Sequence, residues 1–394
     1  MRILKCLLLL FLIILLTGCW DRKELSRISI VTGMAVDKGD NDKYKLTIET
    51  TQAREMTYQT ATGAAPSFVY SLEGNTIAEI AHKFNIATAS IPVYSHMRLL
   101  AISEEVAEKG MLQFMDFVDR NREMRDDFSI VIVKGNSSAG DILRVNNMYK
   151  KSASLKLFIQ LMTSQKDWGG TPDIKLNDFV RIYNSKGQSP VLTAVKLVGD
   201  PKKGGNVENM KSEQPESYVN ISSMAVIKTG KLVGYASLYE VRDMLFVQNK
   251  IKSTAITTNC TNGKFEYRIT NSKTKVTAKE INGIPNFFIN IKTEGNLDGT
   301  ECFRNYKNPT TFDELEVSVN KKMEKEIREF IDKTKVKFNA DIFGLGEMLR
   351  EQDYQHFKKY GNDWDKGFVE SKINIKFNSE IKRSGLRKER AIMK

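Results

Sequence analysis

Histidine and cysteine are scarce in this sequence, and their positions exclude the common protein metal sites. The 394 residues include three histidines, His82, His96 and His356, and four cysteines. No two histidines have the spacing of an H-E-x-x-H site, and no C-x-x-C pair occurs. We therefore expect no zinc site and no metal cofactor.

The short motifs of common enzyme classes are also missing. The sequence has no G-x-S-x-G elbow, no Walker A loop and no G-x-G-x-x-G after a predicted strand. Gly344-Leu345-Gly346 is too short for a phosphate-binding loop, and we interpret it as a turn between two helices. We expect no catalytic residues, no cofactor-binding residues and no cofactor, and hence a protein that is not an enzyme.

Two groups of aspartates are the remaining candidates for cation binding. Asp37, Asp40 and Asp42 crowd a predicted hairpin turn, where aspartate is favoured because its side chain bonds the nearby backbone. Residues 363–367 resemble the start of a calcium loop, but Asn374 stands where that loop needs a glutamate. We expect metal ligands in neither group.

The longest apolar run is short and lies at the start of the chain. It covers residues 6–16 and follows Arg2 and Lys5. Eleven residues are too few to span a membrane, which takes roughly 20, so the pattern predicts a secretory signal peptide over 1–18. The run ends in Leu-Thr-Gly-Cys, which resembles the bacterial lipobox. We expect cleavage between Gly18 and Cys19, followed by S-diacylglyceryl and N-acyl modification of Cys19; the alternative is an ordinary signal peptide that contains a cysteine.

A diacylated Cys19 would hold the chain on the outer face of a membrane, because two acyl chains anchor stably where one does not. The formal net charge is +12, and loss of Arg2 and Lys5 with the signal peptide leaves +10. Such a charge favours an anionic membrane surface or an acidic partner; the alternative is a solvated lysine-rich surface. Because dense basic sequence is confined to the C-terminal end, with a basic tail at 387–394, we expect no nucleic-acid partner.

Alternating strands and helices predict a mixed α/β domain over 19–199. A hairpin is expected at 28–36 and 44–51, a loop at 52–66, and strands at 97–102, 128–133 and 191–198. Helices are expected from Asn75, from Ser103 and around 176–183. Residues 200–217, with two prolines, two glycines and many charges, are predicted to be a linker.

A C-terminal α+β domain is predicted over 218–386. The alternative is that its first part, 218–250, forms a separate small middle unit. A hairpin at 218–227 and 232–236 and a helix at 238–245 come first. Strands at 255–259, 265–270, 275–281 and 286–292 predict an antiparallel meander, followed by a long amphipathic helix over 312–338 and a strand at 369–377. The fold class is thus multi-domain and mixed α+β, with helices packed on mixed sheets.

Cys260 and Cys302 are the two cysteines that remain beside Cys19 in the exported chain. Export permits a disulfide between them. A four-strand meander, however, places Cys260 at one end of the sheet and Cys302 beyond the other. A disulfide needs Cα atoms within about 7 Å, so we expect two free thiols.

Several segments resemble the Ger(x)C family, the lipoprotein C subunits of spore germinant receptors. The most specific is Cys-Trp-Asp-Arg-Lys-Glu-Leu at 19–25, followed by Ile-Val-Thr-Gly-Met-Ala-Val-Asp at 30–37. Weaker matches run in order along nearly the whole chain, at 73–76, 96–105, 225–234 and 341–347. Cys19 is the one functional position that the resemblance carries over.

The resemblance implies a non-enzymatic subunit on the outer surface of the spore inner membrane. Its implied partners are two integral-membrane subunits, A and B, of which B is the favoured nutrient binder, and membrane lipid through Cys19. Trp20 beside the lipid suits the membrane interface, whereas Trp168 is a candidate partner anchor. Two other classes stay open: a lipid-anchored solute-binding protein and a cell-envelope enzyme.

Overall fold

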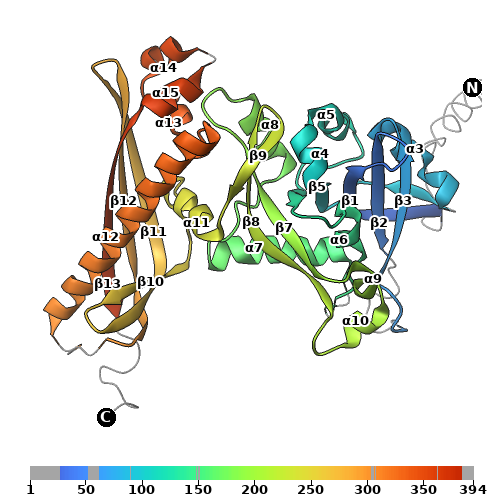
Figure 1. Cartoon of the computed structure of the whole chain (residues 1–394), viewed down its shortest axis with the longest axis horizontal. Helices are drawn as coiled ribbons and strands as arrows, with labels where there is room; N and C mark the ends of the chain where they lie inside the picture. Colours follow the sequence, from blue (N-terminus) through green and yellow to red (C-terminus); the bar gives the residue numbers. More distant parts are fainter. Residues whose placement is uncertain are drawn as a thin grey trace, which may run out of the picture.

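A computed structural model describes residues 27–51, 62–88, 90–147, 149, 151–302, 306, 308–361 and 363–383. It contains a nine-stranded mixed sheet and a four-stranded sheet, with helices packed on both (Figure 1). The larger sheet begins with β1–β3 at one end of the long axis, and β10–β13 form the other end. The predicted mixed α+β class is confirmed.

The larger sheet starts with the predicted hairpin. β1 (Ile28–Lys38) pairs antiparallel with β2 (Tyr44–Thr51), as the β-branched residues and the Gly-Asp-Asn-Asp turn predict. A third strand, β3 (Ser67–Gly74), was not predicted; it pairs with β2. A short strand, β4 (Ile91–Val93), runs beside the start of β1. Residues 52–61 of the predicted loop lie outside the described residues.

Parallel strands form the centre of this sheet. β1, β5 (Leu99–Ser103), β6 (Ser129–Val133) and β7 (Val191–Gly199) are neighbours in that order. Every residue of β5 and β6 is buried. Continuous apolar strands of this kind are typical of parallel sheets that are covered on both faces.

Helices cover both faces of the larger sheet. The apolar side chains divide into two cores, one on each face. The helices on one face are α3 (Ile77–Ala87), α4 (Glu104–Lys109), α5 (Leu112–Arg120) and α8 (Leu176–Asn184), and those on the other are α6 (Ala139–Arg144) and α7 (Ala153–Asp167). The cap of α3 is Thr76, not Asn75, because the Thr76 hydroxyl accepts a hydrogen bond from the Glu79 backbone N–H at 3.1 Å.

The segment predicted as a linker, 200–217, connects two neighbouring strands of the larger sheet. It contains α9 (Pro201–Gly204) and α10 (Val207–Lys211). After it, β8 (Ser217–Lys228) pairs antiparallel with β7, and β9 (Lys231–Ala236) completes the predicted second hairpin. The sheet therefore continues across this segment, and a division of the chain there stays a prediction.

The smaller sheet contains three antiparallel strands, two of them long, where four short ones were predicted. β10 (Thr254–Cys260), β11 (Gly263–Ile281) and β12 (Ile284–Thr300) form the meander, and β13 (Lys372–Arg383) lies parallel to β12. The predicted turn at Asn271-Ser272 is wrong, because β11 passes through it with only an irregularity in register at Thr270.

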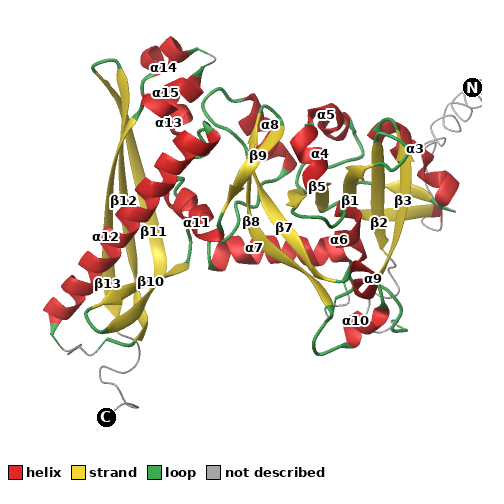
Figure 2. Ribbon diagram, viewed as in Figure 1, coloured by secondary structure: helices red, strands yellow, loops and turns green. Residues whose placement is uncertain are grey.

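Helices cover one face of the smaller sheet. The predicted amphipathic helix is confirmed as α12 (Pro309–Lys333), which continues into a π-helical turn, η2 (Thr334–Phe338). It crosses the four strands on one side (Figure 2). α11 (Leu238–Val247), α13 (Leu345–Gln352), α14 (Tyr354–Tyr360) and α15 (Trp364–Glu370) complete this layer.

Candidate functional site

The residues predicted to carry the lipid anchor lie outside the described residues. These are Gly18, Cys19 and the adjacent Trp20, and the basic tail at 387–394 also lies outside. Within the part of the chain that the structure describes, no helix is both long and apolar enough to cross a membrane.

The segment 341–347 forms a turn around one buried carboxylate. Asp341 accepts hydrogen bonds from the backbone N–H groups of Phe343, Gly344 and Gly346 at 3.0, 2.9 and 2.8 Å. The indole N–H of Trp364 donates a fourth bond, at 2.9 Å. Burial raises the pKa of Asp341 to about 6, although these hydrogen bonds act in the opposite direction. One carboxylate thus fixes the turn that leads into α13.

This turn also joins the two sheets. The backbone N–H of Ser189, just before β7, donates to the Asp341 carbonyl at 2.7 Å, and Gly187 N–H donates to the Glu347 carboxylate at 3.0 Å. A Cβ on Gly346 would lie 2.4 Å from Trp364 Nε1 and 2.6 Å from the Gly187 carbonyl oxygen. The close approach leaves no room for a side chain at Gly346. The interpretation of Gly344-Leu345-Gly346 as a turn between helices holds only for Gly344, which is the N-cap of α13, because Leu345 and Gly346 are the first two residues of that helix.

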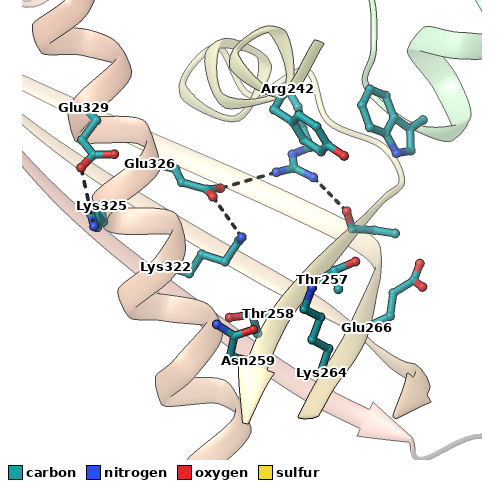
Figure 3. Close-up of a pocket in the computed structure, with 13 residues that line it drawn as sticks. Arg242, Thr257, Thr258, Asn259, Lys264, Glu266, Lys322, Lys325, Glu326 and Glu329 are labelled. Carbon is teal, nitrogen blue, oxygen red and sulfur yellow. Dashed lines mark hydrogen bonds and ion pairs between the residues drawn. The ribbon is translucent and has the colours of Figure 1, made fainter. Parts of the chain in front are cut away.

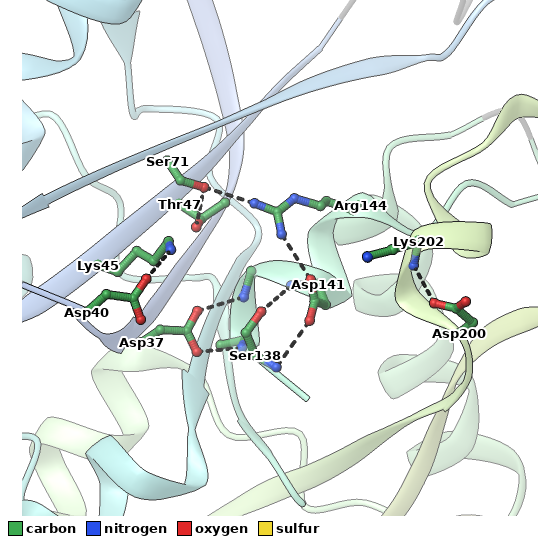
Figure 4. Close-up of polar contacts among 12 residues, drawn as sticks. Asp37, Asp40, Lys45, Thr47, Ser71, Ser138, Asp141, Arg144, Asp200 and Lys202 are labelled. Atoms are coloured by element: carbon green, nitrogen blue, oxygen red, sulfur yellow. Dashed lines mark hydrogen bonds and ion pairs between the residues drawn. The ribbon is translucent and has the colours of Figure 1, made fainter. Parts of the chain in front are cut away.

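A second buried carboxylate, Asp37, corrects the sequence interpretation of the first aspartate group. Asp37 lies within β1 and not in the turn, and it accepts hydrogen bonds from Ala139 and Gly140 N–H at 2.6 and 2.9 Å (Figure 4). These N–H groups open α6, where a helix has unpaired donors. Burial raises the pKa of Asp37. Asp40 does occupy the turn, and its carboxylate lies 3.2 Å from Lys45 Nζ.

A third buried carboxylate, Glu49 in β2, was not predicted. It accepts hydrogen bonds from the Ala153 and Ser154 N–H groups at the start of α7, at 2.7 and 3.0 Å, and from Ser67 Oγ at 2.8 Å. Burial raises its pKa. An acid at an inward position of an alternating strand is the sequence signal that identifies such a residue. Glu49 and Asp37 have a structural function, because they tie helices to the sheet.

A charged cleft with a volume of about 690 Å³ is lined by α11, α12, β10, β11 and Trp168 at the end of α7 (Figure 3). Trp168 and Tyr239 form an aromatic wall, with ring centroids 5.6 Å apart, and Arg242 lies beside the Tyr239 ring. Arg242 is 3% exposed; its Nη1 donates to the Ala255 carbonyl at 2.9 Å, and its Nη2 lies 3.7 Å from Glu326. Trp168, the candidate partner anchor, is therefore part of this cleft.

The charges in this cleft largely neutralise one another. Lys322 pairs with Glu326 at 3.0 Å, and Lys325 lies 3.8 Å from Glu329. Next to Arg242, Asp243 is 3% exposed and its Oδ1 has no hydrogen-bond partner, so burial raises its pKa to about 7. This arrangement contains no nucleophile held by a general base. The Arg242–Glu326 pair joins α11 to α12, whereas the two lysine pairs lie within α12.

No group of metal-ligating side chains gathers among the described residues. His356 lies close to Asp353 and 3.1 Å from Glu280, in a contact between α14 and the end of β11. Asp365 of the second aspartate group pairs with Lys228 at 2.8 Å. Each of these side chains thus has a charged protein partner.

Cys260 and Cys302 form a disulfide, so the prediction of two free thiols is wrong. Their Cα atoms are 6.1 Å apart. The error follows from the extra predicted turn. Because β11 and β12 are continuous, Phe265 near the start of β11 pairs with Thr300 at the end of β12, and Cys260 pairs with Gly263. Both cysteines therefore lie at the same end of the sheet.

Comparison with known proteins gives two adjacent family matches. Residues 21–197 match the model described as "Spore germination protein N-terminal domain", and residues 222–385 match "Spore germination B3/ GerAC like, C-terminal". Among curated proteins, spore germination protein KC of Bacillus subtilis (strain 168) is 28% identical over 97% of both chains. Spore germination protein B3 of the same strain is 26% identical over 95% of this chain and 96% of the relative.

The fold resembles a solved structure. The crystal structure of the GerBC protein superposes with a TM-score of 0.56 at 21% identity, covering 91% of this chain and 99% of that one. At this identity the likeness concerns the fold. The chain therefore belongs to the Ger(x)C family of spore germination proteins, a non-enzymatic family, as the sequence resemblance predicted.

Proposed function

We propose that this protein is the lipid-anchored, extracytoplasmic C subunit of a nutrient germinant receptor. The observation that carries the proposal is the family match, which begins at residue 21, two residues after the cysteine of the lipobox Leu-Thr-Gly-Cys. Residues 1–18 thus have the properties of an export signal, and the two family matches cover 21–197 and 222–385 of the chain that follows. The location is then the outer face of the spore inner membrane, with Cys19 as the link to lipid.

The anchor is tested by the variant Cys19→Ala. Without a thiol to acylate, the chain should remain uncleaved or leave the membrane, and spores should germinate more slowly on nutrients. Cys6→Ala is the matched control, because Cys6 lies in the predicted signal peptide and should be removed with it. Membrane fractionation and mass spectrometry of the N-terminus measure both outcomes. A correctly cleaved Cys19→Ala chain that stays on the membrane would refute the anchor.

We further propose that the subunit is a scaffold for two integral-membrane partners and does not recognise the nutrient. Support comes from the described cleft, whose charges already pair with each other, and from buried carboxylates that serve helices. Anchoring raises the effective concentration of membrane partners around the body of the protein. The alternative, a solute-binding protein, needs two similar lobes around its ligand, and the two sheets here differ in size and strand order.

Nutrient titration distinguishes the scaffold from a sensor. The chain from Trp20 onward, which retains every described element, is mixed with each nutrient that germinates the native spore. A ligand at 100 times its Kd would stabilise the fold by about 2.7 kcal/mol, which thermal unfolding detects easily. We expect no shift. Stabilisation by a germinating nutrient, but not by its inactive enantiomer, would identify this chain as the sensor.

The division into 19–199 and 218–386, with 200–217 as the boundary, is also a proposal. The two family matches end at residue 197 and begin at residue 222, which supports it. Limited proteolysis should cut first within 200–217, and pairing of β7 with β8 should keep the two fragments together. First cuts within 255–295 would show that the boundary is misplaced.

A further inference from the structure

Six lysines share one face of the smaller sheet. Strand register aligns Lys279 with Asn286 and Lys372, then Lys275 with Asn290 and Lys376, and then Lys273 with Lys292 and Asn378. Because side chains alternate between the faces of a strand, these rows point to the same side. All six lysine residues are exposed. We name this surface the lysine face; it consists of Lys273, Lys275, Lys279, Lys292, Lys372 and Lys376.

The lysine face is the open side of the sheet. The intervening residues Phe287, Ile289 and Phe377 are buried in the core on the opposite side. That side is covered by α12, which crosses in front of the strands (Figure 1). On the open side, the Asn378 side-chain amide donates to Asn290 Oδ1 at 3.1 Å, so the rows do lie side by side. The helices α15 and α11 reach these strands from the buried side, where Trp364 packs on Phe287 and Phe246 packs on Phe377.

Positive charge on this face is not balanced by the protein. The two acids in the next row, Glu294 and Glu380, both pair with Lys382, at 3.6 and 3.0 Å. Within the described residues, none of the six lysines of the lysine face forms an ion pair. Lys273 lies directly opposite Lys292, a like-charge pairing that destabilises a sheet. These unpaired lysines lower the stability of the folded protein. Their presence therefore indicates that the face binds an anionic surface outside the protein.

We propose that the lysine face docks on the anionic headgroups of a phospholipid membrane. Lysine is depleted in protein–protein interfaces, which are built around apolar and aromatic cores, so the array does not suit a protein partner. Near an anionic bilayer, each lysine instead adds favourable energy. Phe288 lies between the first two rows and is 41% exposed, in a position to enter the headgroup region.

This contact does not involve Cys19, and it lies at the end of the molecule opposite to β1. β1, which follows the proposed anchor, and β10–β13 occupy opposite ends of the long axis (Figure 1). If the proposed function is right, the two contacts together lay the molecule along the membrane. The inference itself requires no acyl chain, so it is tested on protein without one.

The test uses the chain from Trp20 onward and two kinds of vesicle, phosphatidylcholine alone and phosphatidylcholine with about one-third phosphatidylglycerol. Sedimentation should show binding to the anionic vesicles only. Binding should weaken steadily as salt is raised, because the screening length falls from about 10 Å at 0.1 M to about 3 Å at 1 M. If wild-type protein does not sediment with anionic vesicles at low salt, the proposal is overturned.

A charge-matched pair of variants locates the contact. Replacing Lys273, Lys275, Lys292 and Lys376 by glutamine should lower vesicle affinity at least about tenfold. The control replaces the exposed residues Lys166, Lys202, Lys358 and Lys366, which lie on helices, and should change affinity less than about threefold. A thermal midpoint no lower than that of wild type confirms folding of the first variant.

Two results would contradict a lipid-binding lysine face. Equal loss in both variants would mean that net charge alone drives the binding. Unchanged vesicle binding by the face variant, together with loss of membrane proteins that co-purify with the full-length chain, would mean that the face docks on an acidic protein. Neither result depends on lipidation, so each is distinguishable from failure of the anchor.

Discussion

The two sheets of this protein differ in how many of their faces are covered by helices. The nine-stranded sheet is covered on both faces, and its central strands β5 and β6 are buried throughout. The four-stranded sheet is covered on one face, so its strands alternate between buried apolar and exposed polar residues. The first therefore offers few strand side chains to a partner, whereas the second presents a whole face.

The sheets also differ in the contacts that tie their strands to the rest of the molecule. In the larger sheet, Asp37 and Glu49 bind the N-termini of α6 and α7. In the smaller sheet, a disulfide links Cys260 at the end of β10 to Cys302 beyond β12. Because a sheet covered on one side buries less apolar area per strand, we expect it to depend more on a covalent link. The predictions below test that difference.

The largest effect should come from removing the disulfide. The cysteines are 42 residues apart, and closing a loop of that size corresponds to about 4 kcal/mol in the chain-entropy model. The double variant Cys260→Ser/Cys302→Ser should lose stability of that order in urea unfolding without reductant. With reductant, wild type and variant should unfold alike. Equal stability in both conditions would show that the smaller sheet does not need the link.

The next effect should come from the junction between the sheets. Asp341→Ala removes the acceptor of four buried hydrogen bonds and should cost about 3 kcal/mol, since bonds to charged groups contribute more than neutral ones. Asp353→Ala is the control, because Asp353 caps the exposed helix α14 and should cost about 1 kcal/mol. If the two variants lose the same stability, the 341–347 turn does not hold the sheets together.

The sequence predicts individual elements where the pattern is local. The β1–β2 hairpin, the buried strand β6, and helices α8 and α12 follow from apolar spacing and turn residues within one segment. Two strands show the limit of this approach. β3 was missed beside an apparent loop, and β11 was divided at Asn271-Ser272 because a change of register resembles a turn.

Long-range contacts are less accessible from sequence. The division of β11 moved Cys302 to the wrong end of the sheet and led to the wrong thiol prediction. Asp37 was assigned to a turn because its partners, Ala139 and Gly140, lie about a hundred residues away. The lysine face depends on register between three strands, one of which follows the others by about seventy residues. The spacing of apolar and polar residues within one segment does not show which distant segments contact each other.

The smallest predicted effect concerns Asp243 in α11, the helix that follows the β8–β9 hairpin and contacts α12. Burial raises the pKa of this carboxyl from 3.8 to about 7. The folded state therefore binds the proton more tightly than the unfolded state. Protonation of Asp243 therefore adds to the free energy of unfolding. This contribution is fully present below pH 3.8 and is lost as pH rises through about 7. Above that pH the protein carries a buried charge whose Oδ1 has no hydrogen-bond partner.

Asp243→Asn removes that charge and should raise the free energy of unfolding by about 1 kcal/mol at pH 8, since the loss of attraction to Arg242 offsets part of the gain. The advantage over wild type should shrink as pH falls from 7 toward 4. Asp119→Asn, at an exposed position of α5, should change stability little at any pH. Urea unfolding of all three proteins at pH 5 and pH 8 measures the difference. A pH-independent effect of Asp243→Asn would show that burial between α11 and α12 does not raise the pKa of this carboxyl.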